Sequence, residues 1–346
     1  MKKVLVAMSG GVDSSVCAYL LKEQGFDIAG LTLKLYDSKS KTSMSLQAIE
    51  DAKKVCDELN IKHYVLDLQK DFKQEIIDNF INSYIYAKTP NPCILCNEKI
   101  KFGLLLEYAI KLGFDCIATG HYAKIDLENG IYQLKKPVDE SKDQTYFLYR
   151  LNQYQLSKIL FPLGNYTKVQ IRDIAQKANL TVATKPDSQE ICFIDKTYHE
   201  FLQNNIKDFN KKIVPGYIVD KNGKKLGKHK GLIYYTIGQR SGLGITTPEP
   251  VYVLRLDVAT NTVVIGTKQD VYSKVAKIEN ITYTNTPVEK PFYADVKIRR
   301  MHKPAKALID KNIIVFEEEQ ASITPGQSAV FYNNDYILGG GIITQL

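Results

Sequence analysis

The turn after the first apolar run places the strongest constraint on how this 346-residue chain folds. Residues 4–8 are uniformly apolar and lead into Ser-Gly-Gly-Val-Asp-Ser-Ser at residues 9–15. A strand that ends in glycines and opens a helix is typical of a phosphate-binding loop, because backbone N–H groups can approach the ligand and the helix adds its positive end. Ser9, Ser14 and Ser15 can donate to phosphate oxygens, and Asp13 can cap the helix or help to hold Mg²⁺.

This loop differs from the loop of kinases and GTPases, because no lysine follows the glycines. Its spacing resembles the pyrophosphatase loop of enzymes that cleave ATP to AMP and pyrophosphate. The alternative is a glycine-rich turn between a strand and a helix that binds no ligand.

Length and composition indicate a globular protein of two or three domains, because 346 residues exceed one ordinary core. The chain is 44% hydrophobic and 24% charged, and no apolar run is long enough to cross a bilayer. Met-Lys-Lys leads into a strand instead of a signal sequence, so we expect a cytoplasmic protein without a membrane partner. The formal net charge of +8 suits a polyanionic partner such as a nucleic acid.

Strands and helices alternate up to about residue 120, which predicts a parallel sheet with helices on both faces. The predicted strands are 4–8, 28–35, 63–68 and 116–118, and the predicted helices are 14–23, 45–59, 71–87 and 98–112. Ligands of such sheets bind beyond the carboxyl ends of the strands. We therefore expect the Ser9 loop and Thr119-Gly120-His121 to face one pocket.

The rest of the chain changes in character along its length. A hairpin is predicted at 125–132 with its turn at Asn129-Gly130, followed by helical stretches at 144–151 and 168–178. Short strands with frequent glycines follow residue 206, at 252–264, 292–298, 305–316 and 329–343. We predict a first domain over 1–206, a small central domain over 207–272, and a β-domain over 273–346.

The six cysteines fall into two groups. Cys17, Cys56 and Cys116 lie within apolar helix or strand patterns and are predicted to be buried as small hydrophobic residues. The other three are predicted to lie in loops and need a different explanation; they are Cys93, Cys96 and Cys192.

Two prolines precede Cys93 and Cys96, and we expect them to stiffen a loop that delivers Cys96 to a helix start. A helix N-terminus lowers the pKa of a thiol and favours the reactive thiolate. The Cys-x-x-Cys pair alone fits a redox pair, half of a zinc site or part of an iron–sulfur site, and the chain has no second pair to complete a structural zinc site. Cys192, between Ile191 and Phe193, taken alone fits a buried strand residue.

Seven segments in chain order resemble the tRNA-specific 2-thiouridylase family. They are residues 8–15, 89–102, 118–122, 142–144, 188–194, 235–244, and 324–328 ahead of 338–341. The resemblance implies the PP-loop fold class, an adenine nucleotide alpha hydrolase-like parallel sheet with helices on both faces, followed by a small central domain and a C-terminal β-barrel-like domain. It also implies ATP and Mg²⁺ as cofactors. The ATP site would consist of Ala7, Met8, Ser9, Gly10, Gly11, Val12, Asp13, Ser14, Leu33 and Gly120.

By the same resemblance, the enzyme adenylates the C2 oxygen of the wobble uridine in tRNA and replaces that oxygen with sulfur. Sulfur is carried as a persulfide on Cys192, supplied by a donor protein of a cysteine desulfurase relay. Cys96 attacks the persulfide or releases sulfide, leaving a Cys96–Cys192 disulfide that is reduced after turnover. We expect a monomer.

The family resemblance also implies contacts to the substrate. Asn91, Pro92 and Cys93 would border the target base. The tRNA would contact His121, Lys142, Asp143, Gln144, Arg299, Arg300 and Gln327. Without the resemblance, the Arg299-Arg300 pair would equally fit solvated surface. Because Arg300 stands where many relatives have an aromatic residue, no stacking is expected there.

One departure from the family leaves an alternative open. Cys93 stands where many relatives carry an aspartate with an acid/base role, so that role is in doubt here. Cys93, Cys96 and Cys192 could together hold three irons of a [4Fe-4S] cluster. The persulfide relay is favoured because it uses each cysteine in a distinct step.

Two other classes of protein share part of the pattern. Argininosuccinate, GMP and NAD synthases use a similar loop to adenylate and then transfer nitrogen, but they need no paired loop cysteines. An RNA-binding protein that only senses ATP would show no tRNA-dependent release of pyrophosphate.

Overall fold

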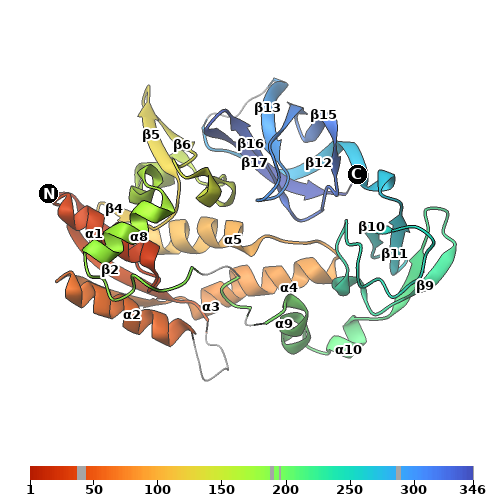
Figure 1. Ribbon diagram of the computed structural model, residues 1–346, viewed down its shortest axis with the longest axis horizontal. Helices are drawn as coiled ribbons and strands as arrows, with labels where there is room; N and C mark the ends of the chain where they lie inside the picture. Colours follow the sequence, from red (N-terminus) through yellow and green to blue (C-terminus); the bar gives the residue numbers. More distant parts are fainter. Residues whose placement is uncertain (37–43, 188–190, 195, 286–289, 346) are drawn as a thin grey trace.

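A computed structural model describes residues 1–36, 44–187, 191–194, 196–285 and 290–345 (Figure 1). Its first domain contains a five-stranded sheet with the order β3-β2-β1-β4-β7, in which every pairing is parallel. The strands are β1 (Lys3–Ala7), β2 (Asp27–Lys34), β3 (Lys62–Asp67), β4 (Cys116–Ala118) and β7 (Ile159–Leu160). The predicted parallel sheet is confirmed, and the sequence missed only β7, which is too short to show a pattern.

Both faces of this sheet are covered by apolar side chains, as a near-continuous apolar strand requires. Val4 and Val6 pack toward α1 (Val12–Glu23), α2 (Met44–Glu58) and α8 (Lys168–Lys177). Leu5 points the other way and packs with Phe102 and its neighbours. The alternation along β1 therefore places helices on both sides.

The predicted helix at 71–87 is a continuous helical stretch with a wider π turn in its middle. It consists of α3 (Gln69–Phe72), η1 (Lys73–Ile77) and α4 (Asp78–Ile85). The stretch runs under the barrel beside a second long helix, to which it is linked by residues 86–91 (Figure 1).

The second long helix begins earlier than predicted. It consists of α5 (Pro92–Leu95), η2 (Cys96–Leu104) and α6 (Leu105–Lys111), instead of starting near residue 98. The Asn91 side chain accepts a 3.2 Å hydrogen bond from the Cys93 N–H, and Pro92 occupies the first helical position. The prediction that Cys93 and Cys96 lie in a loop is therefore wrong.

The helix predicted at 144–151 is also wrong, because only a 3₁₀ turn forms there, η4 (Thr145–Phe147). Tyr146 and Tyr149 are buried, and their hydroxyl groups reach the Ser328 carbonyl at 2.8 Å and the Ser328 hydroxyl at 3.1 Å. These contacts to the barrel override the helical pattern of the local sequence.

The predicted hairpin is confirmed as β5 (Lys124–Glu128) and β6 (Ile131–Lys135). Asn129 and Gly130 both have positive φ, as the tight hairpin turn requires. Lys135 pairs with Tyr336 of the last strand, so the hairpin connects the first domain to the C-terminal β-domain.

The remaining strands form two further sheets. The middle domain has the order β10-β11-β8-β9, with β8 (Gly216–Val219), β9 (Lys225–His229), β10 (Tyr252–Asp257) and β11 (Thr262–Gly266). The C-terminal domain has β12 (Tyr272–Tyr283), β13 (Phe292–Lys297), β14 (Ala305–Asp310), β15 (Ile313–Ala321), β16 (Ser328–Asn333) and β17 (Tyr336–Thr344). Pairing of β12 with both β15 and β17 closes these strands into an antiparallel barrel, as predicted.

Short helical segments complete the architecture. They are η3 (Glu140–Lys142), α7 (Gln153–Ser157), η5 (Pro162–Asn165), α9 (Tyr198–Asn205), α10 (Phe209–Lys212), η6 (Leu232–Tyr234) and η7 (Gln269–Val271). Within the part of the chain that the structure describes, no helix has the length and apolar character needed to span a bilayer.

Candidate functional site

The loop between β1 and α1 has the backbone geometry that its glycines predict. Gly10 has a φ of +68°, and a Cβ there would lie 2.5 Å from the Ala48 carbonyl oxygen. Gly11 is the N-cap of α1, and its carbonyl oxygen accepts hydrogen bonds from the Ser14 hydroxyl at 3.2 Å and the Ser15 hydroxyl at 2.9 Å. Gly10 is therefore required sterically, whereas Gly11 leaves the loop surface free of a side chain.

The loop and the segment after β4 meet, as predicted. A Cβ on Gly120 would lie 2.8 Å from the Asp13 carbonyl carbon and 2.9 Å from the Ser14 nitrogen, so no larger residue fits between these backbones. The Tyr122 hydroxyl donates a 2.8 Å hydrogen bond to the Asp13 carboxylate. Both strand ends therefore contribute to one site.

The other predicted nucleotide residues lie at the same edge of the sheet. Ala7 ends β1, and the Met8 N–H donates a 2.8 Å hydrogen bond to the Leu31 carbonyl of β2. Leu33 lies near the carboxyl end of β2. The Ser9 and Ser14 hydroxyl oxygens are 3.2 Å apart, at the start of α1.

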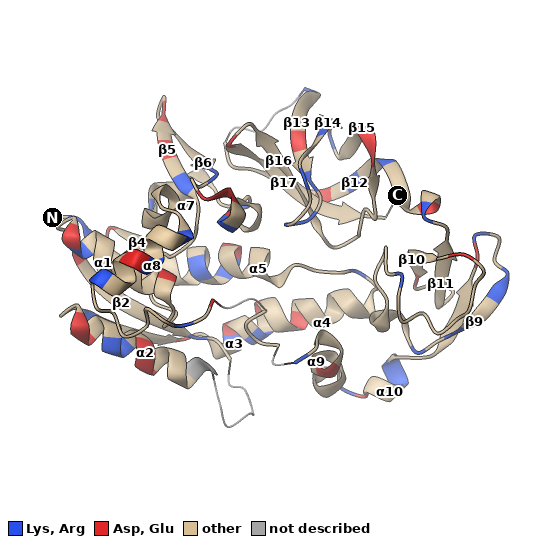
Figure 2. Cartoon of the chain, viewed as in Figure 1, with Lys and Arg blue, Asp and Glu red and all other residues tan. Residues whose placement is uncertain are grey.

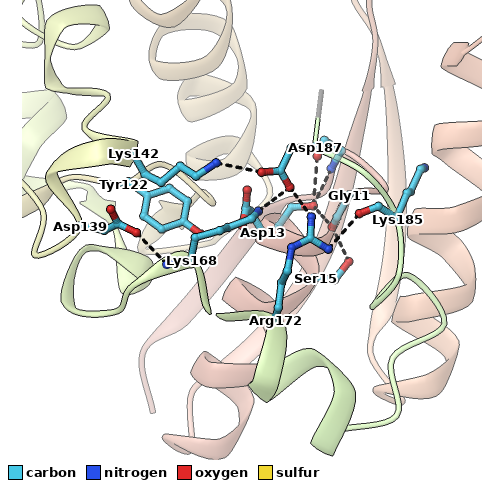
Figure 3. A network of polar contacts seen from close by, with 12 residues as sticks. Gly11, Asp13, Ser15, Tyr122, Asp139, Lys142, Lys168, Arg172, Lys185 and Asp187 are labelled. Atoms are coloured by element: carbon cyan, nitrogen blue, oxygen red, sulfur yellow. Dashed lines mark hydrogen bonds and ion pairs between the residues drawn. The ribbon is translucent and has the colours of Figure 1, made fainter. Parts of the chain in front are cut away.

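A network of ion pairs that the sequence did not predict lies beside the loop (Figure 3). The Lys168 ammonium contacts the Asp13 carboxylate at 2.7 Å and the Asp187 carboxylate at 2.8 Å. Arg172 and Lys142 contact Asp187 at 2.7 Å and 3.0 Å. Although burial raises the pKa of Asp187, hydrogen bonds from Lys168 and Lys142 outweigh it and lower this pKa to about 2.

Lys185 connects the segment that carries Asp187 to the loop. Its ammonium donates to the Gly10 carbonyl at 2.8 Å and contacts Asp51 at 2.6 Å. Lys185 and Asp187 belong to a polar stretch before Cys192 that is visible in the sequence, but the stretch does not indicate which residues they contact. Lys168 gave no such signal, because it is separated from Asp13 by 155 positions.

Cys96 and the Cys192 segment pack into one apolar cluster. Cys96 is 8% exposed and lies in this cluster with Phe193 and Ile194. Cys192, which precedes Phe193 in the chain, is exposed. Residues 188–190 of the matching segment lie outside the described residues. The cluster therefore places the segment of Cys192 beside Cys96, which the resemblance pairs with Cys192.

The expected low pKa of Cys96 is wrong. Cys96 lies inside the helix and not at its N-terminus, and burial raises its pKa to about 12. The packing of protein atoms around Cys192 likewise raises its pKa to about 11, although its side chain reaches solvent. The positive charge of Lys101 opposes the shift at both cysteines.

Cys93 lies near the other two cysteines but is exposed. The protein atoms around the Cys93 thiol exclude water and raise its pKa, and the positive charges of Lys101 and Arg300 oppose this rise. Among residues 1–36, 44–187, 191–194, 196–285 and 290–345, no group of three or more His, Cys, Asp or Glu side chains is arranged to hold a metal ion. As placed, the three cysteines do not fit an iron–sulfur cluster.

Several of the predicted tRNA contacts make structural contacts within the protein. His121 is buried, its ring contacts the rings of Phe102 and Phe161, and it shares a 2.8 Å hydrogen bond with Thr119. The Gln144 side chain accepts from the Tyr122 N–H at 2.8 Å. Asp143 accepts from Thr145, and Lys142 contacts Asp187 as described above. Direct contact of these residues with tRNA stays a prediction.

The barrel contributes the other predicted tRNA residues. Arg299 donates to the Ala321 carbonyl at 3.2 Å, and the exposed Arg300 guanidinium lies 5.6 Å from the centre of the Phe147 ring. The Gln327 amide donates to the Thr89 carbonyl at 2.8 Å. Figure 2 shows basic residues on the hairpin β5–β6, on the helix labelled α5 and on the barrel.

Family profiles match each part of this architecture. The profile described as the tRNA methyl transferase HUP domain matches residues 2–196. The tRNA methyl transferase PRC-barrel domain matches 199–267, and the aminomethyltransferase beta-barrel domain matches 273–343. The fold and the loop thus define a nucleotide-binding protein of the HUP class with two appended β-domains.

Curated relatives narrow this class. The tRNA-specific 2-thiouridylase MnmA 2 of Thermoanaerobacter sp. (strain X514) is 49% identical, over 99% of this chain and 97% of the relative. The tRNA-specific 2-thiouridylase MnmA of Clostridioides difficile (strain 630) is 47% identical, over 99% of this chain and 98% of the relative. The chain belongs to the tRNA-specific 2-thiouridylase family.

A more distant likeness exists among solved structures. The U34-tRNA thiolase NcsA from Methanococcus maripaludis with its [4Fe-4S] cluster is 19% identical, covers 61% of this chain and 66% of its own, and has a TM-score of 0.37. This score is too low to support an argument about the present chain.

Proposed function

We propose that this chain is a tRNA-uridine 2-sulfurtransferase. It uses ATP to activate the C2 oxygen of the wobble uridine and replaces that oxygen with sulfur. The relatives named above are tRNA-specific 2-thiouridylases. The structural observation that carries the proposal is the packing of the Cys192 segment against the helix of Cys96, in the domain that also holds the Ser9–Ser14 loop.

The loop serves the activation step. The C2 oxygen of uridine attacks the α-phosphorus of ATP, the bond to the β-phosphate breaks, and pyrophosphate leaves. Ser9, Ser14 and the loop N–H groups stabilise the charge that develops on the leaving pyrophosphate. Asp13, in the first turn of α1, is the carboxylate that fits a Mg²⁺ ion bound to phosphate, since this ion prefers oxygen ligands. Mg²⁺ would offset the phosphate charge.

The two cysteines serve the sulfur step. A donor protein places a sulfur atom on Cys192 as a persulfide. The Cys96 thiolate attacks the Cys192 sulfur, the bond to the outer sulfur breaks, and hydrosulfide leaves as a disulfide forms between the two cysteines. Hydrosulfide then attacks C2 and AMP departs with the oxygen. A dithiol reductant supplies the two electrons that restore both thiols.

Burial sets a condition on this step. With a pKa of about 12, Cys96 is a thiol at neutral pH and must lose its proton to attack. Lys101 lies five positions after Cys96 on the π-helical stretch and lowers the pKa of this thiol. We infer that Lys101 favours the Cys96 thiolate during turnover.

The tRNA partner would approach the side of the molecule that carries Cys93 and Arg300. Arg300 is exposed, and its charge lowers the pKa of Cys93. A nucleotide whose base lies beside Cys93 would therefore have its phosphates near this arginine. Asn91 and Pro92 would border the same base, because they precede Cys93 at the helix start. We also propose that the protein acts as a cytoplasmic monomer, with domains over 1–206, 207–272 and 273–346.

A thiolation assay tests the proposal. Purified protein is supplied with ATP, Mg²⁺, a persulfide donor and tRNA, and 2-thiouridine is measured after digestion of the tRNA. Cys96→Ala and Cys192→Ala are expected to abolish product, whereas Cys93→Ala reduces it in part. Cys116→Ala, at a buried cysteine of β4, is the control and should thiolate normally.

Two results would contradict the proposed reaction, and a third would contradict only the persulfide relay. ATP-dependent product formation that is unchanged after alkylation of Cys96 would favour a synthase that transfers nitrogen. Failure of tRNA to stimulate pyrophosphate release would favour an RNA-binding protein that only senses ATP. Complete loss of thiolation in Cys93→Ala, together with iron and sulfide in anaerobically purified protein, would favour the cluster.

A further inference from the structure

Three cationic side chains converge on one carboxylate beside the phosphate-binding loop. Lys168 and Arg172 contact one oxygen of Asp187, at 2.8 Å and 2.7 Å, and Lys142 contacts the other at 3.0 Å. Figure 3 shows these side chains from two elements pointing at the same carboxylate, next to Asp13 at the start of α1.

The position of Lys168 is electrostatically unfavourable unless anions surround it. Lys168 is 9% exposed and occupies the first helical position of α8, where the helix presents its positive end. A buried ammonium at such a place needs negative partners, and it has two, Asp13 and Asp187. Asp13 follows the loop directly, so the ammonium faces the place where phosphates would bind.

The loop itself contributes no cation. No lysine follows its glycines, unlike the loop of kinases and GTPases, and the cation nearest its backbone in this network is Lys185 on the Gly10 carbonyl. A departing pyrophosphate needs positive charge from the protein as well as from Mg²⁺. Lys168 extends from α8 and contacts Asp13 in the first turn of α1, the same end of this helix where a lysine of the loop would lie.

We propose that Lys168, Arg172 and Lys142 form a pyrophosphate-binding cradle beside the loop, and that Asp187 holds the place of the anion when no nucleotide is bound. This inference rests on the proposed function and names a site for its leaving group. Lys142, assigned to tRNA by the family resemblance, would instead contact phosphate.

The charges in the cradle support an exchange of anions. The three cations contact the carboxylates of Asp13 and Asp187, and the carboxylate of Asp139 accepts a 2.9 Å hydrogen bond from the Lys168 N–H at the start of the same helix. Pyrophosphate offers more negative charge and more oxygens than a single carboxylate. Because both anions use the same three cations, binding of pyrophosphate displaces Asp187, and Asp187 weakens that binding.

Calorimetric titration of the full chain with magnesium pyrophosphate, without tRNA, tests the cradle. Lys168→Met is expected to weaken binding at least tenfold, and Lys168→Arg to retain part of the affinity. Asp187→Asn is expected to strengthen binding at least threefold, because the competing charge is removed. Lys177→Met, which removes a charge from an exposed position of the same helix, should stay within twofold of the native protein.

The proposal is overturned if Lys168→Met binds within twofold of the native protein, if Asp187→Asn binds more weakly, or if the native protein binds no magnesium pyrophosphate. Should Lys168→Met fail to fold, the partly exposed Lys142→Met and Arg172→Met take its place, each with an expected loss of at least threefold. If the native protein thiolates tRNA but these variants bind magnesium pyrophosphate with native affinity, the cradle is overturned and the proposed function stands. If the variants lose pyrophosphate affinity as expected but the native protein does not thiolate tRNA, the proposed function is overturned and the cradle stands.

Discussion

The Gln327 side chain donates a 2.8 Å hydrogen bond to the Thr89 carbonyl, although 238 positions separate the two residues. The Thr89 N–H in turn donates to the Pro325 carbonyl at 2.9 Å. A Cβ on Gly326 would lie 2.8 Å from the Thr89 nitrogen, so the two backbones are in close contact. The barrel thereby holds the segment that leads to Asn91 and the helix of the cysteines.

Gln327→Ala should therefore destabilise the protein by about 1 kcal/mol, the usual contribution of such a hydrogen bond. Urea unfolding measures the change in the free energy of unfolding. Gln203→Ala, at an exposed position of α9, is the control and should change it by less than about 0.5 kcal/mol. Equal stability of Gln327→Ala and the native protein would show that this contact does not hold the segment.

Two adjacent glycines should respond differently to alanine. Gly10→Ala must adopt a positive φ and meets the Ala48 carbonyl, so we expect a loss of at least about 2 kcal/mol in the free energy of unfolding. Gly11 has an extended backbone, and a Cβ there meets only the Ser9 hydroxyl at 3.5 Å.

Gly11→Ala should therefore lose less stability than Gly10→Ala, about 1 kcal/mol or less for the poorer N-cap, but should weaken nucleotide binding, because its Cβ would stand in the way of the phosphates. Urea unfolding and calorimetric titration with ATP separate the two effects. Native affinity for ATP in a folded Gly11→Ala variant would contradict a phosphate site at this loop.

Alkylation of Cys192 should show its raised pKa. With a pKa of about 11, the thiolate fraction and hence the iodoacetamide rate should rise about tenfold per pH unit from about pH 7 to about pH 10, without a plateau. Mass spectrometry of the Cys192 peptide gives the rate. Lys101→Met should slow alkylation, because it removes a charge that lowers this pKa, whereas Lys99→Met on the same helix should not. A plateau below about pH 9 would contradict the raised pKa.

Asp187 should make stability depend on acidic pH. Its folded pKa of about 2 lies below its ordinary value of 3.8, so its contribution to stability is present above the unfolded pKa and is lost as the pH falls toward 2. Asp187→Asn should cost about 1 kcal/mol at neutral pH and about half as much near pH 3, after allowance for solvent screening. Urea unfolding at both pH values measures this. A difference that does not shrink on acidification would show that the ion pairs are not its cause.

The sequence predicted the parts of this protein that depend on local pattern. The apolar run ending in Ser9-Gly10-Gly11 predicted both the strand and the helix of the loop, and the alternation of elements predicted the parallel sheet. The Asn129-Gly130 turn predicted the hairpin. Each of these features is encoded within a few neighbouring residues.

The features that could not be predicted from the sequence depend on unrecognised capping or on contacts between distant residues. The start of the second long helix at Pro92 follows from an Asn91 cap that was not recognised. The raised pKa of Cys96 follows from burial against Phe193, and the role of Lys168 from contact with Asp13. None of these pairings leaves a periodic signal in the chain.

In the proposed reaction Cys192 carries the sulfur that reaches the tRNA, and Cys96 releases it by forming a disulfide with Cys192. A single turnover tests this step, with protein loaded with persulfide on Cys192, then given ATP and tRNA and quenched in acid without reductant. We expect one Cys96–Cys192 disulfide, identified by peptide mass spectrometry, for each 2-thiouridine formed. Formation of 2-thiouridine while both cysteines remain unlinked would contradict the account.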